Sequence, residues 1–157
     1  MSRKYLIISL AIAFVICVSL TPIIAGQSTY SVNVGGIDFY MPNDYKLDEE
    51  FIFEEDINSQ DRWGNDVPVH YRCEYYSDGE NTIEITVTTS YGEPFTMDNV
   101  AFAGYGEPKK TIANKTGVVS ASPGDVLFSY CEDGKLIQIE TLMDKNNEKM
   151  IEKVIGG

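Results

Sequence analysis

The sequence has few of the side chains that metal centres and nucleophilic active sites require. Its 157 residues include a single histidine, His70, and three cysteines, Cys17, Cys73 and Cys131. This set is too small and too scattered for the Cys and His ligands of a zinc site within one chain. Cys73 follows His70 by three positions, and on a strand this odd spacing sends the side chains to opposite faces. We therefore predict no transition-metal site and no local Cys–His pair.

Basic residues are also scarce. Twelve lysines and arginines stand against 24 aspartates and glutamates, which gives a formal net charge of −12 at pH 7. Arg3 and Lys4 precede residue 25, whereas every acidic residue follows it, so the part after residue 25 is more acidic still. Such a surface repels phosphate backbones and anionic headgroups. We expect no nucleic-acid partner, and membrane contact only through the N-terminal segment.

Motifs for catalysis and cofactor binding are missing as well. Gly104-Tyr105-Gly106 lacks the pattern of a phosphate-binding loop. The acidic clusters at 48–50 and 54–56 lie together in a polar stretch, whereas glycoside hydrolysis needs two carboxylates facing each other across a cleft. We assign no catalytic residue and no cofactor. Oxygen-bearing side chains that suit calcium do crowd one segment, without the spacing of an EF-hand, and the candidate ligands are Asp56, Asn58, Asp61 and Asp66.

The N-terminal segment has the features of an export signal. Arg3 and Lys4 precede an apolar run from Tyr5 to Leu20, and Ala25 is a small residue at the expected cleavage site. Ile23 fits poorly two positions before that site, and residues 5–24 approach the roughly 20 residues that span a bilayer. Two alternatives stay open: residues 1–25 are a cleaved signal peptide, or they remain as an N-terminal hydrophobic helix and anchor. Both place residues 26–157, a single domain, outside the cytoplasm.

The remainder predicts an α+β fold built from antiparallel hairpins. Alternating runs at 29–34 and 37–41 flank Gly35-Gly36, and runs at 125–131 and 135–142 flank Asp133-Gly134. A longer hairpin pairs 67–76 with 82–91. Shorter strands are expected at 51–53, 111–113 and 117–122, a polar loop at 54–66, a helical turn or two at 96–104, and a helix at 144–155. We expect about six to eight strands with the C-terminal helix packed on the sheet.

Alternation also predicts which side chains share a face. Val69, Tyr71, Cys73 and Tyr75 form the apolar face of one strand, and His70, Arg72, Glu74 and Tyr76 form its wet face. In the last hairpin, Phe128, Tyr130, Ile137 and Ile139 share a face opposite Cys131 and Leu136. Cys73 and Cys131 both lie in the part of the chain that is predicted to be exported, so they are a possible disulfide. The alternation of side chains along their strands, however, predicts that they lie on opposite faces. The sequence leaves the bond open.

Two further surface features are visible in the sequence. Asn114-Lys115-Thr116 is a glycosylation sequon at a predicted turn, which makes Asn114 a possible acceptor in an exported chain. Trp63, Tyr76 and Tyr105 are aromatic residues near predicted loops. They either form a patch for a ligand or partner, or anchor their loops in the core.

Several segments together carry a resemblance to a known family. They are Gly36-Ile-Asp-Phe-Tyr-Met-Pro42, Thr111-Ile-Ala-Asn-Lys-Thr-Gly117, Phe128-Ser-Tyr-Cys-Glu-Asp-Gly-Lys-Leu-Ile-Gln-Ile139 and the helix at 148–155. In this order they resemble small exported domains of unknown function from methanogenic archaea, which are similar to PsbP-like α+β sandwiches. The resemblance covers most of residues 30–155. It implies an antiparallel sheet with helices packed against it, and it supplies no catalytic residues.

These observations favour a non-enzymatic, extracytoplasmic or envelope-associated binding module. Its partner would be a protein or an envelope component. A calcium- or cation-binding surface protein is the alternative hypothesis, and a small secreted hydrolase is the third. A contiguous exposed aromatic patch would favour the binding module. His70 lining a pocket beside a carboxylate and a hydroxyl would favour the hydrolase.

Overall fold

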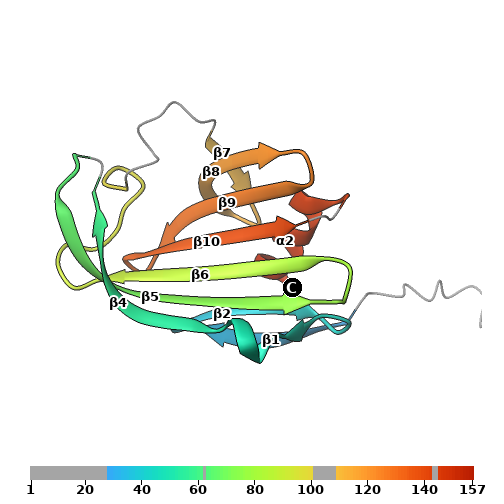
Figure 1. Ribbon diagram of the computed structural model, residues 1–157. Coiled ribbons are helices and arrows are strands. Elements are labelled where there is room, and N and C mark those ends of the chain that lie inside the picture. Colours follow the sequence, from blue (N-terminus) through green and yellow to red (C-terminus); the bar gives the residue numbers. More distant parts are fainter. Residues whose placement is uncertain (1–27, 62, 101–108, 143–144) are drawn as a thin grey trace, which may run out of the picture.

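The computed structural model describes residues 28–61, 63–100, 109–142 and 145–157, which form antiparallel sheets and a C-terminal helix (Figure 1). The predicted α+β class with an antiparallel sheet and a C-terminal helix is therefore confirmed. The N-terminal hydrophobic segment, Tyr105 and the second half of the helix expected at 96–104 lie outside these residues. In the described part of that expected helix, residues 97–99 form a turn and Val100 forms an isolated bridge to Asp61.

The first hairpin forms a small sheet of its own. β1 (Thr29–Val34) pairs with β2 (Ile37–Pro42) in the predicted register, with Val34 opposite Ile37. Gly35 and Gly36 have φ angles of +57° and +82°. These left-handed angles are those of a two-residue type I′ turn, in which glycine is favoured because it has no Cβ. The predicted hairpin is confirmed.

The second sheet has eight strands and is antiparallel throughout. Its order is β3-β5-β6-β10-β9-β8-β7, and β4 pairs with β5 beside this path. The strands are β3 (Lys46–Leu47), β4 (Phe53–Gln60), β5 (Asp66–Ser77), β6 (Thr82–Ser90), β7 (Lys109–Ile112), β8 (Lys115–Ser122), β9 (Asp125–Glu132) and β10 (Lys135–Leu142). Together with β1 and β2, the described residues form more strands than the expected six to eight. The excess arises because β3 and β4 both pair with β5 at one edge of the large sheet.

The strand β4 corrects a prediction. A short strand was expected at 51–53 and a polar loop at 54–66, but Glu49–Phe51 forms the short 3-10 helix η1 and Phe53–Gln60 forms an eight-residue strand. β4 pairs along β5 from Phe53 opposite Cys73 to Gln60 opposite Asp66. A polar strand without alternation is stable here because the long β5 offers an unpaired edge. Cross-strand pairs of opposite charge also contribute.

One face of the large sheet carries the main core. The β1–β2 hairpin and the helix α2 (Asn147–Gly156) cover this face, and Figure 1 shows α2 behind β10. Ile151 and Val154 of α2 are fully buried. They pack into a cluster with hairpin and sheet residues that include Phe39, Met41, Ile83, Ile85, Val87, Phe128, Tyr130, Ile137 and Ile139. The helix begins three residues later than expected, and Asp144, the first residue of the expected helix, lies outside the described residues.

The register of β5 on β6 corrects the assignment of faces. Tyr76 lies opposite Ile83, Glu74 opposite Ile85, and Cys73 opposite Thr86. The predicted wet face of β5 therefore points to the core side, and the predicted apolar face of Val69, Tyr71, Cys73 and Tyr75 points to the other side. Alternation in β5 separates its two faces but does not say which one meets the apolar residues of β6. The faces predicted for β9 and β10 are confirmed.

The side of the sheet opposite the main core is here called the open face. A second, smaller cluster covers one end of it, where Phe95 and Val100 pack on Val69. The segment that carries Phe95 is attached to the β9–β10 turn, because the Phe95 amide donates to the Gly134 carbonyl over 2.8 Å. Away from this cluster, the open face carries the half-buried side chains of Tyr71, Tyr75, Glu84, Gln138 and Glu140.

Candidate functional site

Two hollows lie on the open face and share Tyr71 and Gln138. The outer hollow has a volume of about 240 Å³, and β4 contributes its wall with Ile57, Ser59 and Gln60. The inner hollow has a volume of about 110 Å³ and is lined by Tyr71, Glu84, Thr86, Leu127, Gln138 and Glu140. The shared residues make the two hollows parts of one surface, which crosses β4, β5, β6, β10 and β9.

Two carboxylates face each other in the inner hollow. Glu84 on β6 lies directly opposite Glu140 on β10. Burial raises the pKa of the Glu140 carboxyl, and repulsion by Glu84 and Asp125 raises it further. Glu84 accepts a contact from the Cys73 thiol at 3.5 Å and a hydrogen bond from the Thr86 hydroxyl at 3.3 Å. Like charges directly opposite on neighbouring strands destabilise a sheet, so this pair is costly to the fold.

Aromatic rings border the same surface. Phe51 and Phe53 are 50% and 48% exposed, and both contact Tyr75 edge to face, with ring centroids 6.0 and 6.3 Å apart. Burial raises the pKa of the Tyr75 phenol, and a hydrogen bond to Glu84 adds to this shift. Tyr75 therefore links the aromatic border to the paired carboxylates. Burial also raises the pKa of Tyr71 to about 12, so both phenols stay protonated at neutral pH.

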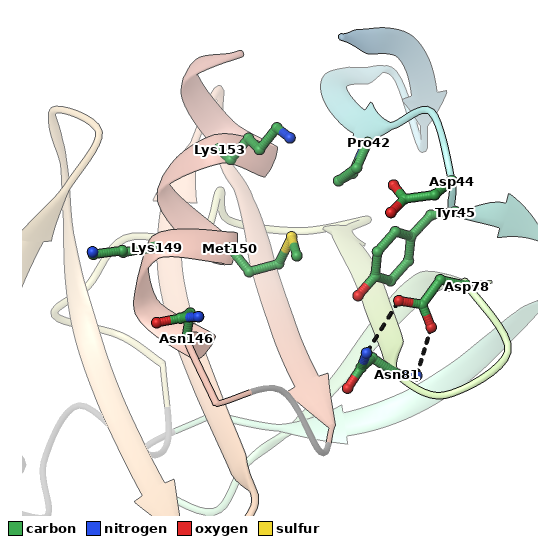
Figure 2. Close-up of a pocket in the computed structure, with 9 residues that line it drawn as sticks. All are labelled: Pro42, Asp44, Tyr45, Asp78, Asn81, Asn146, Lys149, Met150 and Lys153. Carbon is green, nitrogen blue, oxygen red and sulfur yellow. Dashed lines mark hydrogen bonds between the residues drawn. The ribbon is translucent and has the colours of Figure 1, made fainter. Parts of the chain in front are cut away.

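A larger hollow of about 400 Å³ lies between α2 and the turns at the end of β2 and β5 (Figure 2). Figure 2 shows Lys149 and Lys153 on the helix side, and Asp44, Tyr45 and Asp78 across from them. Asp78 belongs to its own turn, because its carboxylate accepts hydrogen bonds from the amides of residues 80 and 81 and from the Asn81 side chain. These bonds lower the pKa of Asp78. The lining is polar and mixed in charge, without a nucleophile beside a base.

The structure places His70 between two carboxylates of β4. Its Nδ1 lies 3.0 Å from Asp56 Oδ1 and its Nε2 lies 3.2 Å from Glu54 Oε1. The expected neighbour Arg72 donates to Glu54 and to Glu74, and Glu74 accepts from the Tyr76 hydroxyl over 2.5 Å. His70 does not line any of the three hollows described above. The cluster connects β4 to β5 on the core side of the sheet.

The four candidate calcium ligands are engaged elsewhere or lie apart. Asp56 accepts from Tyr91 over 2.6 Å as well as facing His70. Asp61 accepts from the amides of Trp63 and Asn65 and from the Asn65 side chain, which orders its own turn. Asn58 and Asp66 occupy different positions on β4 and β5. Within the described ranges, no group of three or more His, Cys, Asp or Glu side chains is arranged to hold a metal ion.

Cys73 and Cys131 are free thiols in this structure, so they form no disulfide. The prediction that they lie on opposite faces is wrong, since Cys73 pairs with Thr86 and Cys131 with Leu136 on the open face. β6 and β10 separate their strands, which amounts to about 14 Å of sheet. A disulfide requires Cα atoms within about 7 Å. Burial raises the pKa of both thiols, that of Cys131 to about 11.

The remaining candidates differ in exposure. Asn114 is exposed in the β7–β8 turn with a φ of +66°, and the Thr116 hydroxyl of its sequon lies 3.0 Å from that of Thr111. Trp63 is 66% exposed beside the β4–β5 turn, so of its two alternatives the structure favours a surface position over anchoring in the core. Tyr76 is only 2% exposed and belongs to the main core, which agrees with the alternative that it anchors its segment in the core. Tyr105 lies outside the described residues.

Comparisons with protein-family models, curated proteins and solved structures found no match to this chain. Among the described residues, no helix has the length and apolar character needed to cross a membrane.

Proposed function

We propose that this protein is a non-enzymatic, extracytoplasmic binding module, and that the open face of its large sheet is the binding surface. One observation carries the proposal: two hollows, a border of exposed aromatic rings and the opposed Glu84 and Glu140 adjoin on a single surface. Exposed aromatic patches rimmed by polar groups are typical of interaction sites. The export signal in residues 1–25 supports the location, and residues 5–24 would tether the module if they remain.

The chemistry of this surface favours a basic segment of a partner protein. The whole chain carries a net charge of −12, and the inner hollow concentrates two carboxylates where no ion pair of the described residues neutralises them. A lysine or arginine side chain entering this hollow would relieve the repulsion between Glu84 and Glu140. Its alkyl stem would pack on Tyr71 and Leu127, and the aromatic border would accept a neighbouring apolar side chain.

The PsbP-like α+β sandwich remains part of the proposal. An antiparallel sheet with a C-terminal helix on one face supports this relationship, and the described residues cover only one end of the opposite face, which leaves room for the binding surface. Reaction chemistry is not part of the proposal, because the paired carboxylates share their small hollow with tyrosine, threonine and glutamine and with no base–nucleophile pair.

The test is titration of the full chain, in a mild non-ionic detergent, with a blocked peptide of alternating arginine and tryptophan. We expect calorimetry to detect binding that weakens with added salt. The Glu84→Gln/Glu140→Gln double variant should raise Kd by about 30-fold, because each of the two lost contacts contributes on the order of 1 kcal/mol.

The matched control is the Glu80→Gln/Glu152→Gln double variant. Both control residues are exposed and lie away from the open face, and their substitution removes the same net charge. This variant should bind the peptide nearly as well as the parent chain. Equal weakening by the two double variants would show that only the overall acidity attracts the peptide, and the proposal would then be wrong.

A further inference from the structure

The edge strand β4 is held by a polar cluster that depends on one titratable group. β4 pairs with β5 at the edge of the large sheet (Figure 1), and seven of its eight residues are exposed. β4 buries little apolar surface among the described residues. Its pairing with β5 therefore depends on side-chain contacts in addition to the backbone hydrogen bonds. On the core side these contacts are made by Glu54 and Asp56 with His70, Arg72 and Tyr91.

The geometry around His70 requires a particular protonation state. Each ring nitrogen faces a carboxylate oxygen, Nδ1 at 3.0 Å and Nε2 at 3.2 Å. An ionised carboxylate only accepts hydrogen bonds, and a neutral imidazole has a single N–H. A neutral ring would leave one nitrogen lone pair against a carboxylate oxygen. Only the imidazolium donates to both Asp56 and Glu54 at once.

We propose that protonated His70 fastens β4 to β5, and that loss of this proton loosens the wall that β4 contributes to the outer hollow. β4 supplies Ile57, Ser59 and Gln60 to that hollow from its middle and its end. A pH change at His70 on one side of the sheet thus alters the surface on the other side. The loosening of β4 holds as a prediction whether or not the hollow binds the partner proposed above.

The charged groups around His70 favour the protonated form. From β4, Asp56 and Glu54 face the ring; on β5, Arg72 lies beyond Glu54 and is itself paired with Glu74. On β6 the residue opposite His70 is the uncharged Thr89, and beyond it Lys135 of β10 donates to the Gly35 carbonyl over 2.7 Å. The hydrogen bond to Asp56, then that to Glu54, raises the pKa of His70 above 6.5, against partial desolvation.

The sign of the pH dependence follows from this shift. Because the folded-state pKa of His70 lies above its unfolded value, the contribution is fully present below about pH 6.5 and is lost as the pH rises through the folded pKa. The effect is local and modest, because the side chains of His70, Glu54 and Asp56 are 34%, 47% and 68% exposed. Exposed ion pairs are screened by water and salt.

Hydrogen exchange detected by mass spectrometry tests the proposal on the full chain in mild detergent. After correction for intrinsic exchange rates, the protection of residues 53–60 should fall by up to about fivefold between pH 5.5 and pH 8.5, the range for an exposed ion pair. Residues 83–89 of β6 serve as the internal control and should change little. In His70→Gln the protection of residues 53–60 should be low and independent of pH.

Two controls keep the test decisive. Tyr91→Phe removes the other partner of Asp56 but leaves both carboxylates on His70, so its pH step should persist. His70 is the only histidine, so its ring resonances titrate without overlap and report its pKa in the parent chain directly. A midpoint at or below 6.5, a pH-independent β4 in the parent chain, or a step that survives in His70→Gln would each overturn the proposal.

Discussion

At the scale of single residues, the side chain that is hardest to explain by folding is Glu140. It is half-buried, it faces Glu84 across two hydrogen-bonded strands, and its pKa is raised by burial and by its acidic neighbours. Glutamine has nearly the same shape and can donate a hydrogen bond to Glu84. A residue kept at a cost to stability is a common property of binding sites.

We therefore expect Glu140→Gln to stabilise the folded protein at pH 7. Removing one of two opposed like charges should raise the free energy of unfolding by about 0.2–1 kcal/mol, measured by urea denaturation. The gain should shrink as the pH falls through the raised pKa of Glu140, because protonation then relieves the same repulsion in the parent chain. Glu132→Gln is the control, since Glu132 pairs with Lys115. Equal destabilisation by both substitutions would mean that Glu140 is structural.

At the scale of elements, local signals predicted the hairpins but not how they meet. Gly35-Gly36 and Asp133-Gly134 have the left-handed φ angles that their turns require, so the strands beside them follow from the sequence. The pairing of β6 with β10 joins segments far apart in the chain, and no turn specifies its register. The opposed Glu84 and Glu140 depend on that register. β4 escaped prediction because its partners, His70 and Arg72, lie on the next strand.

One close approach between strands gives a sharp test of the packing. Gly117 on β8 lies so near β9 that an added Cβ would stand 2.2 Å from the Ser129 carbonyl oxygen and 2.8 Å from the Phe128 ring. Phe128 stacks on Tyr130 in the main core, with ring centroids 5.4 Å apart. The backbone and the ring would both have to move to admit a side chain.

We expect Gly117→Ala to destabilise the protein by about 1–3 kcal/mol, the usual cost of overpacking, as measured by thermal and urea unfolding. Gly92→Ala is the matched control, because the nearest atom to its added Cβ is the Ser90 hydroxyl at 3.7 Å, an ordinary contact. This control should change stability only slightly. If Gly117→Ala were as stable as Gly92→Ala, the β8–β9 pairing described above would be wrong.

At the scale of the whole molecule, charge and architecture act together. Because the net charge is −12, the excess acidic side chains repel one another in the folded protein. The described ion pairs lie at the β4–β5 edge and around β7, β8 and α2. On the open face, the carboxylates of Glu84 and Glu140 have no cationic ion-pair partner among the described residues. An acidic molecule of this kind gains stability from any cation that screens it, which is different from possessing a calcium site.

Thermal unfolding of the full chain separates these two possibilities. Sodium chloride should raise Tm between about 0.01 M and 0.1 M, as the screening length falls from about 30 Å to about 10 Å. Calcium and magnesium chloride at equal ionic strength should act alike, because the oxygens of Asp56 and Asp61 already accept hydrogen bonds from Tyr91 and Asn65. A larger shift with calcium, reversed by a chelator and absent in Asp61→Asn, would instead support a calcium-binding surface protein. Equal Tm shifts with calcium and magnesium would instead support the view that the acidic surface attracts a basic partner to the open face.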